Sequence, residues 1–393
     1  MERLIGKYAR KIIDAGLATD PLICGIDDEA FWNRADDSIP VLQAVLDGMN
    51  INSLIVAEPA EPYHTILGYL AGRYPDTITP SDCETRTFLH DLPVTATFSA
   101  AAILAQLLRR KSVIVADGRS VRVVTFGTVS PEQAFVTLSS VLFSCFVLFF
   151  SDFLTDCKAG RVTEAQKQSF TAALAHLDPP PIKAPKLRTG PFAAEEEVYQ
   201  GIIEAGLATV RYRLVDSYFG NISYRLGDTI YISQTGSSLD ELAGCIDPCP
   251  MDGSSSAGIT ASSELTAHSE IYCRTDNRAV LHGHPKFSVI LSMDCDEQGC
   301  PDRGRCHVRC AKKRYIGDVP VVPGEVGTGP TGLCHTLPPA IRDRRGVIVW
   351  GHGLFTVGRN DFNEAFESLL AIENMCRQEY FTRVGGKGSF VVL

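Results

Sequence analysis

The N-terminal half of the chain alternates between apolar runs typical of buried strands and segments whose apolar residues recur at helical spacing. The predicted strands are residues 51–57, 112–116 and 121–126, and the predicted helices are residues 63–74, 99–110 and a long helix that begins at Pro131. Asp117-Gly118 between two of the strands is a turn signal that predicts a hairpin. The pattern therefore predicts an α/β domain, whose polar residues suggest no particular role.

The C-terminal half has the same mixture of strand and helix patterns. Predicted helices cover residues 195–207, 263–274 and 360–383, and predicted strands cover residues 220–225, 229–233, 279–284 and 345–350. Asp361, followed three residues later by Glu364, is the start signal of the last helix.

A proline-rich segment separates the two halves. Asp178 to Pro191 holds five prolines and little apolar content, which is typical of a semi-rigid, extended linker. We therefore expect an N-terminal domain at residues 1–177, a linker at residues 178–194 and a C-terminal domain at residues 195–393.

Composition narrows the class of protein. With 393 residues, of which 45% are hydrophobic and 21% charged, the chain has the composition of a globular enzyme. Its net charge of −9 disfavours a nucleic-acid binder and a polybasic membrane protein, so an anionic ligand needs a local site. The start of the chain lacks the apolar run of a signal peptide, which predicts a cytoplasmic protein with reduced cysteines.

One apolar stretch has to be considered as a possible membrane span. Residues 134–150 carry no charge and many Phe, Leu and Val, but the stretch is slightly short for a bilayer span and contains several Ser and Thr. Ser130-Pro131-Glu132 before it is a helix-start signal. We therefore expect a helix that is buried in its own domain or packed against another subunit.

Three histidines and one glutamate carry most of the candidate chemistry. His282 and His284 end an apolar strand, and alternate residues of a strand face the same side. His352 lies at a second, glycine-flanked strand end, so three imidazoles can form an open metal site, with Glu264 as an acid or base beside it. The simpler interpretation is that each histidine belongs to the core and that Glu264 only favours a helix N-terminus.

These segments, in this order, resemble the class II aldolase/adducin family over about residues 195–381. The motifs that carry the resemblance are Gly220-Asn221-Ile222-Ser223, Thr235-Gly236, Ser262-Ser263-Glu264 with His268, His282-x-His284, and Gly351-His352-Gly353 followed by Glu364-Ala365. The resemblance implies an α/β/α domain around a central, mainly antiparallel sheet. Nothing comparable covers the N-terminal half.

The resemblance also implies a site. It places a divalent metal, usually zinc, on His282, His284 and His352, with Glu264 as the acid or base. It places the substrate phosphate around Asn221, Thr235, Gly236, Ser262 and Ser263. Free N–H groups at the helix start marked by Ser262 and Ser263 agree with an anion there, although each of these residues also suits an ordinary turn or cap. His268 is expected to orient Glu264 or to pack. The family implies a homotetramer in which a neighbour's tyrosine completes the pocket.

The chemistry that this site implies is reversible aldol cleavage of a ketose phosphate, in which the metal stabilises an enediolate and Glu264 transfers the proton. Epimerisation, dehydration or decarboxylation of a similar substrate can use the same groups. A non-catalytic, adducin-like interaction module is the alternative of another class. Such modules tend to lose the metal ligands, and this chain keeps all three histidines and Glu264.

Two features depart from the family pattern. Cys295, Cys300, Cys306 and Cys310 form a cysteine-rich insertion at residues 295–310, which can hold a structural zinc or an iron–sulfur cluster or can be a polar loop with reduced thiols. Residues 327–332 match G-x-G-x-x-G, but the proline inside this run and the apparent lack of a following helix and acidic partner disfavour a dinucleotide site.

Overall fold

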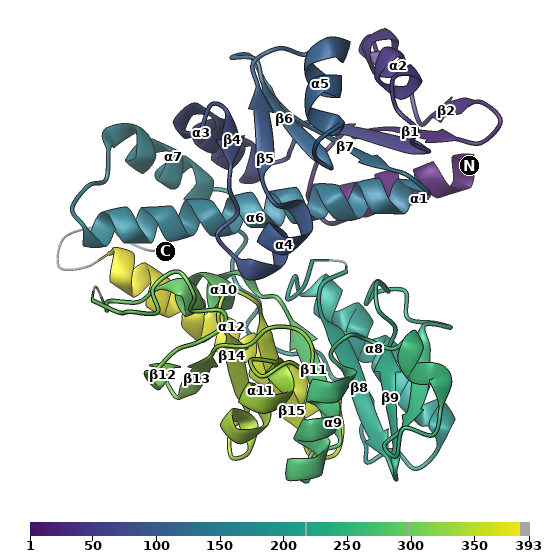
Figure 1. Cartoon of the computed structure of the whole chain (residues 1–393), viewed down its shortest axis with the longest axis vertical. Helices are drawn as coiled ribbons and strands as arrows, with labels where there is room; N and C mark the ends of the chain where they lie inside the picture. Colours follow the sequence, from purple (N-terminus) through teal and green to yellow (C-terminus); the bar gives the residue numbers. More distant parts are fainter. Residues whose placement is uncertain (217, 298, 386–393) are drawn as a thin grey trace. The chain divides into compact units, whose positions relative to one another are not determined.

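The chain divides into two compact units, Met1–Asp178 and Pro179–Leu393 (Figure 1). The computed structural model describes residues 1–216, 218–297 and 299–385. Each unit is a mixed sheet covered by helices, so the predicted α/β fold class with a separate N-terminal part is confirmed.

The N-terminal unit is a seven-stranded sheet with helices on both faces. Its strands are β1 (Leu22–Ile26), β2 (Ala30–Trp32), β3 (Ser53–Ala57), β4 (Thr77–Ile78), β5 (Leu92–Thr95), β6 (Ser112–Ala116) and β7 (Val121–Gly127), in the order β2-β1-β3-β7-β6-β5-β4. Its helices are α1 (Glu2–Asp14), α2 (Ile39–Asp47), α3 (Tyr63–Arg73), α4 (Cys83–Leu89), α5 (Ala100–Leu107), α6 (Pro131–Lys158) and α7 (Glu164–Leu174). Helices α2 and α5 pack on one face, while α1, α3 and α6 contact the sheet from the other.

Helix α6 forms the centre of the N-terminal unit and contacts β3, β7, α1, α3 and α4. Its aromatic side chains are buried, and the ring of Phe153 stacks on that of Phe170 in α7 with centroids 3.6 Å apart. By length and composition alone this helix could cross a membrane, but 89% of its most apolar window is buried inside the structure, and its main contacts are with elements of its own unit. The apolar stretch therefore serves as the core of its own domain.

Asp82, at the N-terminus of α4, gives the N-terminal unit a predicted pH dependence. Its buried carboxylate accepts hydrogen bonds from the backbone N–H and the hydroxyl of Thr85, at 2.8 and 2.5 Å. Burial raises the pKa of Asp82 to about 6, above the ordinary value of 3.8. The folded chain binds the Asp82 proton more tightly than the unfolded chain, which adds to the free energy of unfolding at low pH. This contribution is lost as the pH rises from about 4 to 6.

Asp82 should lower the free energy of unfolding by on the order of 3 kcal/mol between pH 4 and pH 7, since two pKa units correspond to roughly that free energy. We expect Asp82→Asn to lack this decrease. Asparagine keeps the helix cap without the charge. Denaturant unfolding of the wild type and the variant at pH 4 and pH 7 measures the difference. Equal changes in both proteins would contradict the assignment.

The C-terminal unit is an eight-stranded sheet between two helical layers. Its strands are β8 (Asn221–Leu226), β9 (Thr229–Ser233), β10 (Ile246–Pro250), β11 (Ala279–Gly283), β12 (Arg314–Ile316), β13 (Val319–Val322), β14 (Gly346–Val349) and β15 (Leu354–Gly358), in the order β10-β9-β8-β11-β15-β14-β13-β12. Its helices are α8 (Glu195–Arg211), the 3₁₀ helix Ser256–Ile259, α9 (Leu265–Arg274), α10 (Lys286–Met293), α11 (Leu333–Ile341) and α12 (Phe362–Val384). Among the described strands of this sheet only β13 and β14 are parallel neighbours, as expected for a mainly antiparallel sheet.

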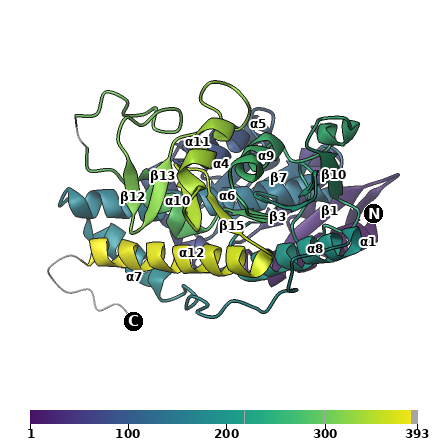
Figure 2. The ribbon, with the colours of Figure 1, turned by 90° about the horizontal axis from the view of Figure 1, so that it is seen from below.

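The two faces of this sheet carry different helices. Helices α9 and α11 cover one face and share a core with β9, β11, β14 and β15. Helices α8, α10 and α12 cover the other, and Figure 2 shows α8 and α12 along one side. The start of α9 therefore lies over the face to which alternate residues of β11 point.

Residues 179–194 of the proline-rich segment are part of the C-terminal unit. They are extended, but Leu187 and Phe192 are buried in the C-terminal unit. The N–H of Leu187 donates to Oδ1 of Asn363 at 2.9 Å, and the N–H of Phe192 donates to the hydroxyl of Tyr224 at 3.0 Å. The segment is anchored to α12 and β8 of its own unit.

Candidate metal centre

Three histidines converge at one end of the C-terminal sheet. His282 is the fourth residue of β11, His284 follows that strand, and His352 lies in the turn between β14 and β15. Strand β15 lies between β11 and β14, so the two histidine-bearing chain segments meet at the same sheet end. His282 and His284 point the same way because they are two residues apart.

The ligand nitrogens of the three rings lie within 4.8 Å of one another, and all three side chains are buried. Nε2 of His282 lies 2.9 Å from Nε2 of His284 and 3.2 Å from Nε2 of His352. In a tetrahedral zinc site with Zn–N distances of about 2.0–2.1 Å, ligand nitrogens lie about 3.4 Å apart. The spacing of the nitrogens therefore fits a common cation.

The tautomer of His282 supports the same interpretation. Its Nδ1 lies 3.1 Å from the carbonyl oxygen of Leu354, and a carbonyl can only accept a hydrogen bond. Nδ1 therefore carries the proton, and Nε2 presents its lone pair to the other two rings. A backbone carbonyl that fixes the ring in this way is a usual companion of a metal-ligating histidine. Phe355 stacks on the same ring with centroids 3.8 Å apart.

Glu264 lies beside the histidines, at the residue that precedes α9. Its carboxylate is 5% exposed, and its two oxygens lie 3.0 Å from Nε2 of His352 and 3.6 Å from Nε2 of His282. Burial alone would raise the pKa of this carboxyl, but the charge of His282, the hydrogen bond and charge of His352, and the hydrogen bond from Asn221 outweigh it and hold the pKa well below its usual range. The carboxylate is therefore ionised at neutral pH.

Asn221 holds this carboxylate in place. Its Nδ2 donates to Oε2 of Glu264 at 2.8 Å, while its Oδ1 is buried without a partner among the described residues. Asn221 pairs with His282 across β8 and β11, so the sheet register brings the amide to the site. The structure thus shows Asn221 in contact with Glu264, where the sequence had suggested a phosphate ligand only.

Gly353 leaves room for the rings. A Cβ at this position would lie 2.5 Å from the carbonyl oxygen of Gly283, 2.6 Å from Cε1 of His282 and 3.0 Å from Cδ2 of His284. Any side chain here would push the two imidazoles out of place. The site therefore requires glycine at position 353 for steric reasons.

The four remaining phosphate candidates lie in two segments joined by hydrogen bonds. The hydroxyl of Thr235 accepts the N–H of Ser263 at 3.0 Å, and the N–H of Ser262 donates to the carbonyl of Ser233 at 3.0 Å. The N–H of Glu264 donates to the Ser262 hydroxyl at 3.3 Å. The N–H groups of Ser262 and Ser263, which were expected to be free, are therefore already hydrogen-bonded.

The exposure of the four candidates differs, and the Thr235 hydroxyl also donates to the carbonyl oxygen of Ala261 at 3.2 Å. Thr235, Gly236 and Ser263 are exposed to solvent, whereas Ser262 is buried. Gly236 has a φ of +71°, which allows the tight turn after β9. A phosphate at this turn would be bound mainly through hydroxyl groups.

His268 does not join the metal cluster. Its Nδ1 lies 2.7 Å from the hydroxyl of Ser223, which in turn lies 2.6 Å from the hydroxyl of Tyr272. Burial, with a smaller contribution from the charge of His282, lowers the pKa of His268 to about 3, although Glu264 acts in the opposite direction. His268 is thus a neutral core residue of α9.

Glu373 is a site residue that the sequence gave no reason to select. From the middle of α12 its carboxylate accepts the N–H groups of Phe287 and Ser288, both at 2.8 Å, and the Ser288 hydroxyl at 2.7 Å. Phe287 and Ser288 lie in the first turn of α10, which begins two residues after His284. Glu373 therefore fixes the backbone that follows this candidate ligand.

The cysteines of the insertion stay apart from this site. All four are free thiols, and within the described residues they form no group as close as that of the histidines. Burial and the nearby thiols of Cys310 and Cys295 raise the pKa of Cys306, which indicates that these three side chains lie near one another. A second metal or an iron–sulfur cluster remains a prediction.

The glycine-rich run at residues 327–332 does precede a helix, α11, which corrects the sequence analysis. The N–H at the start of this helix, on Leu333, donates to the carbonyl of Glu325 at 2.9 Å. The Thr331 hydroxyl donates to the Glu325 carboxylate at 2.5 Å. The loop satisfies its own polar groups.

Comparison with known proteins gives this arrangement a family. A sequence model described as "Class II Aldolase and Adducin N-terminal domain" matches residues 200–380. The resemblance of the C-terminal half to the class II aldolase/adducin family is confirmed by this match. The predicted enzyme superfamily is thereby confirmed, and the N-terminal half has no family match.

Two curated proteins and one solved structure are among those to which the chain is similar. L-fuculose phosphate aldolase of Methanococcus maripaludis is 28% identical over 165 residues, which are 41% of this chain and 84% of that protein. A probable bifunctional methylthioribose-1-phosphate isomerase/methylthioribulose-1-phosphate dehydratase of Nocardia farcinica is 27% identical over 196 residues, 44% of this chain but only 33% of that protein. L-fuculose-1-phosphate aldolase from Thermus thermophilus is 24% identical, with a TM-score of 0.37, over 47% of this chain and 96% of that one.

Proposed function

We propose that the C-terminal domain is a metal-dependent lyase that cleaves a small ketose phosphate by a reversible aldol reaction. The observation that carries the proposal is the convergence of three buried imidazole nitrogens beside the Glu264 carboxylate. The names of the curated relatives, an aldolase and a dehydratase of sugar phosphates, support a phosphorylated sugar as the substrate.

The residues divide the work as follows. A zinc or other divalent cation held by His282, His284 and His352 would supply Lewis acidity at a substrate carbonyl. Glu264 removes the proton from the carbon beside that carbonyl in the condensation direction and returns it in the cleavage direction. Asn221 orients the Glu264 carboxylate through its 2.8 Å hydrogen bond.

Binding of the substrate uses the neighbouring turn. We propose that the phosphate binds the exposed hydroxyls of Thr235 and Ser263 and the backbone at Gly236. The buried Ser262 would stabilise this region through its hydroxyl, which accepts the N–H of Glu264. We also propose a homotetramer in the cytoplasm, in which a tyrosine from a neighbouring subunit completes the pocket.

Dehydration is the second candidate reaction. The dehydratase part of the Nocardia relative's name favours it. In this reaction Glu264 would remove a proton from the carbon beside the carbonyl and pass it to the hydroxyl group that leaves from the next carbon, so the products are an unsaturated compound and water. The same residues serve both reactions.

A panel of ketose phosphates, incubated with the zinc-loaded full chain, tests the proposal. Release of an aldehyde that stops on addition of a chelator supports aldol cleavage. Loss of water without fragmentation, detected by mass spectrometry, supports the dehydratase. A chain that converts none of the panel while its metal site is loaded would overturn the lyase assignment.

A further inference from the structure

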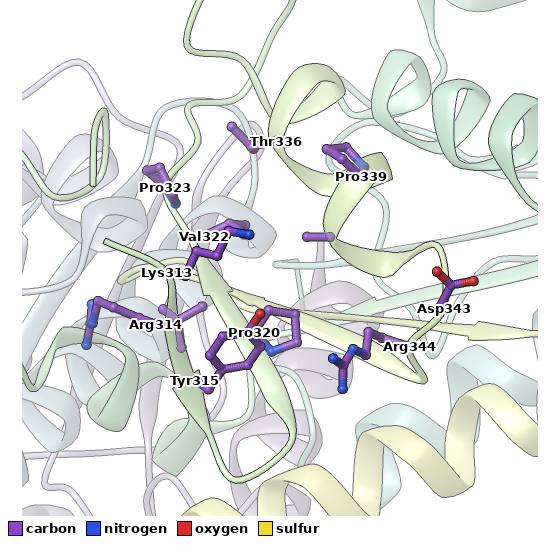
Figure 3. Close-up of a pocket in the computed structure, with 12 residues that line it drawn as sticks. Lys313, Arg314, Tyr315, Pro320, Val322, Pro323, Thr336, Pro339, Asp343 and Arg344 are labelled. Carbon is purple, nitrogen blue, oxygen red and sulfur yellow. The ribbon is translucent and has the colours of Figure 1, made fainter. Parts of the chain in front are cut away.

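A second pocket lies in the C-terminal unit, between the β12–β13 hairpin and α11 (Figure 3). Its volume is about 540 Å³, within the range of about 300–1,000 Å³ that is usual for small-molecule sites. None of the residues that line it belongs to the candidate metal centre. The pocket is therefore a separate feature of this domain.

The charges around this pocket are unbalanced. Lys313, Arg314 and Arg344 line it, with Asp343 as the one acidic residue. Arg314 donates to the backbone carbonyl of Asp294 at 2.5 Å, and Arg344 donates to that of Asp318 at 3.3 Å. Within the part of the chain that the structure describes, none of the three cations has a carboxylate partner.

This local excess of positive charge contrasts with the whole chain, whose net charge is −9. Guanidinium groups without a carboxylate partner, in one pocket with an ammonium group, are donors that suit a doubly charged oxyanion, since guanidinium groups can bind phosphate oxygens in pairs. The charge pattern therefore favours a phosphate over a neutral ligand.

The walls of the pocket add a flat, apolar surface. Tyr315 is 49% exposed, and the guanidinium carbon of Arg344 lies 5.9 Å from the centre of its ring. In Figure 3, Arg314 and Arg344 flank Tyr315 and Pro320. An aromatic ring beside cations can hold the flat part of a ligand while its charged part binds the cations.

We propose that this pocket binds a small organic phosphate, with the phosphate on Lys313, Arg314 and Arg344 and a flat apolar part on Tyr315. The site does not depend on the reaction proposed for the metal centre. Strand β13, which lines the pocket, pairs with β14, the strand that leads to His352. A ligand in this pocket would thus contact β13, the direct neighbour of the strand that ends at the His352 turn.

Calorimetric titration of the full chain with phenyl phosphate tests this site, because the probe joins a phosphate to a flat ring. We expect the double variant Lys313→Gln/Arg344→Gln to bind the probe about tenfold more weakly or worse than the wild type. Arg345→Gln is the matched control, since Arg345 follows Arg344, pairs with Asp318 at 3.0 Å and does not line the pocket. Equal affinity in the double variant and the wild type would overturn the proposal.

Two further measurements separate this pocket from the proposed catalytic phosphate site. Binding that survives Thr235→Val but is lost in the double variant supports the pocket, whereas binding lost only with Thr235→Val overturns it. Inorganic phosphate should bind more weakly than phenyl phosphate because it lacks the ring. Equal affinity for both probes would contradict the role assigned to Tyr315.

Discussion

Glu264→Gln is expected to lower turnover by a factor of about 10²–10⁴, the usual contribution of a general acid or base, while the metal content stays unchanged. Glutamine has the same shape and can still accept the Asn221 hydrogen bond, but it cannot take up or return the proton. The three imidazoles are untouched by this change. Steady-state rates on the substrate found in the panel, together with metal analysis, measure both effects.

Glu270→Gln is the matched control for this variant. Glu270 lies on the same helix, α9, and pairs with Arg274 at 2.9 Å, away from the histidines. It should leave the rate unchanged within about twofold, as expected for a half-exposed ion pair. An undiminished rate in Glu264→Gln would end the assignment of this residue as the acid or base.

His282→Ala and His352→Ala are each expected to weaken zinc binding by more than about 100-fold, because even partners outside the ligand set change metal affinity by about 10- to 100-fold. Each variant removes one of three nitrogens that lie within 4.8 Å of one another. Wild-type protein should therefore purify with about one equivalent of metal, and the variants with little. Metal analysis by mass spectrometry measures the content.

The stability of the protein provides an independent measurement of the same site. A cation that binds only the folded chain raises the unfolding temperature, so a chelator should lower it in the wild type and leave the two variants unchanged. His335→Ala, on the exposed side of α11, is the control and should behave as the wild type. Full metal retention in both His282→Ala and His352→Ala would remove the metal centre.

The shared direction of His282 and His284 could be predicted because it rests on a local rule: residues two apart on a strand face the same side. His352 lies 70 positions from His282, so its place beside them rested on the glycine-flanked strand end and on the family resemblance. The contribution of Glu373 could not be predicted. Its contact with the start of α10 joins residues 85 and 86 positions apart, and no local pattern encodes such a pairing.

Two elements, β10 and α11, were not predicted because they contain prolines. Strand β10 contains Pro248 and Pro250, but it lies at the edge of the sheet, where a missing N–H costs little. Helix α11 contains Pro338 and Pro339 and spans only nine residues. In both cases tertiary packing overrides a residue that usually ends the element.

The position of α6 along the chain has a consequence for how the protein is made. This helix would be the most aggregation-prone part of the N-terminal unit if it emerged before its partners. All seven strands of its sheet precede Pro131 in the chain, so the ribosome has already delivered the surface on which α6 packs. The most apolar segment can therefore dock as soon as it leaves the exit tunnel.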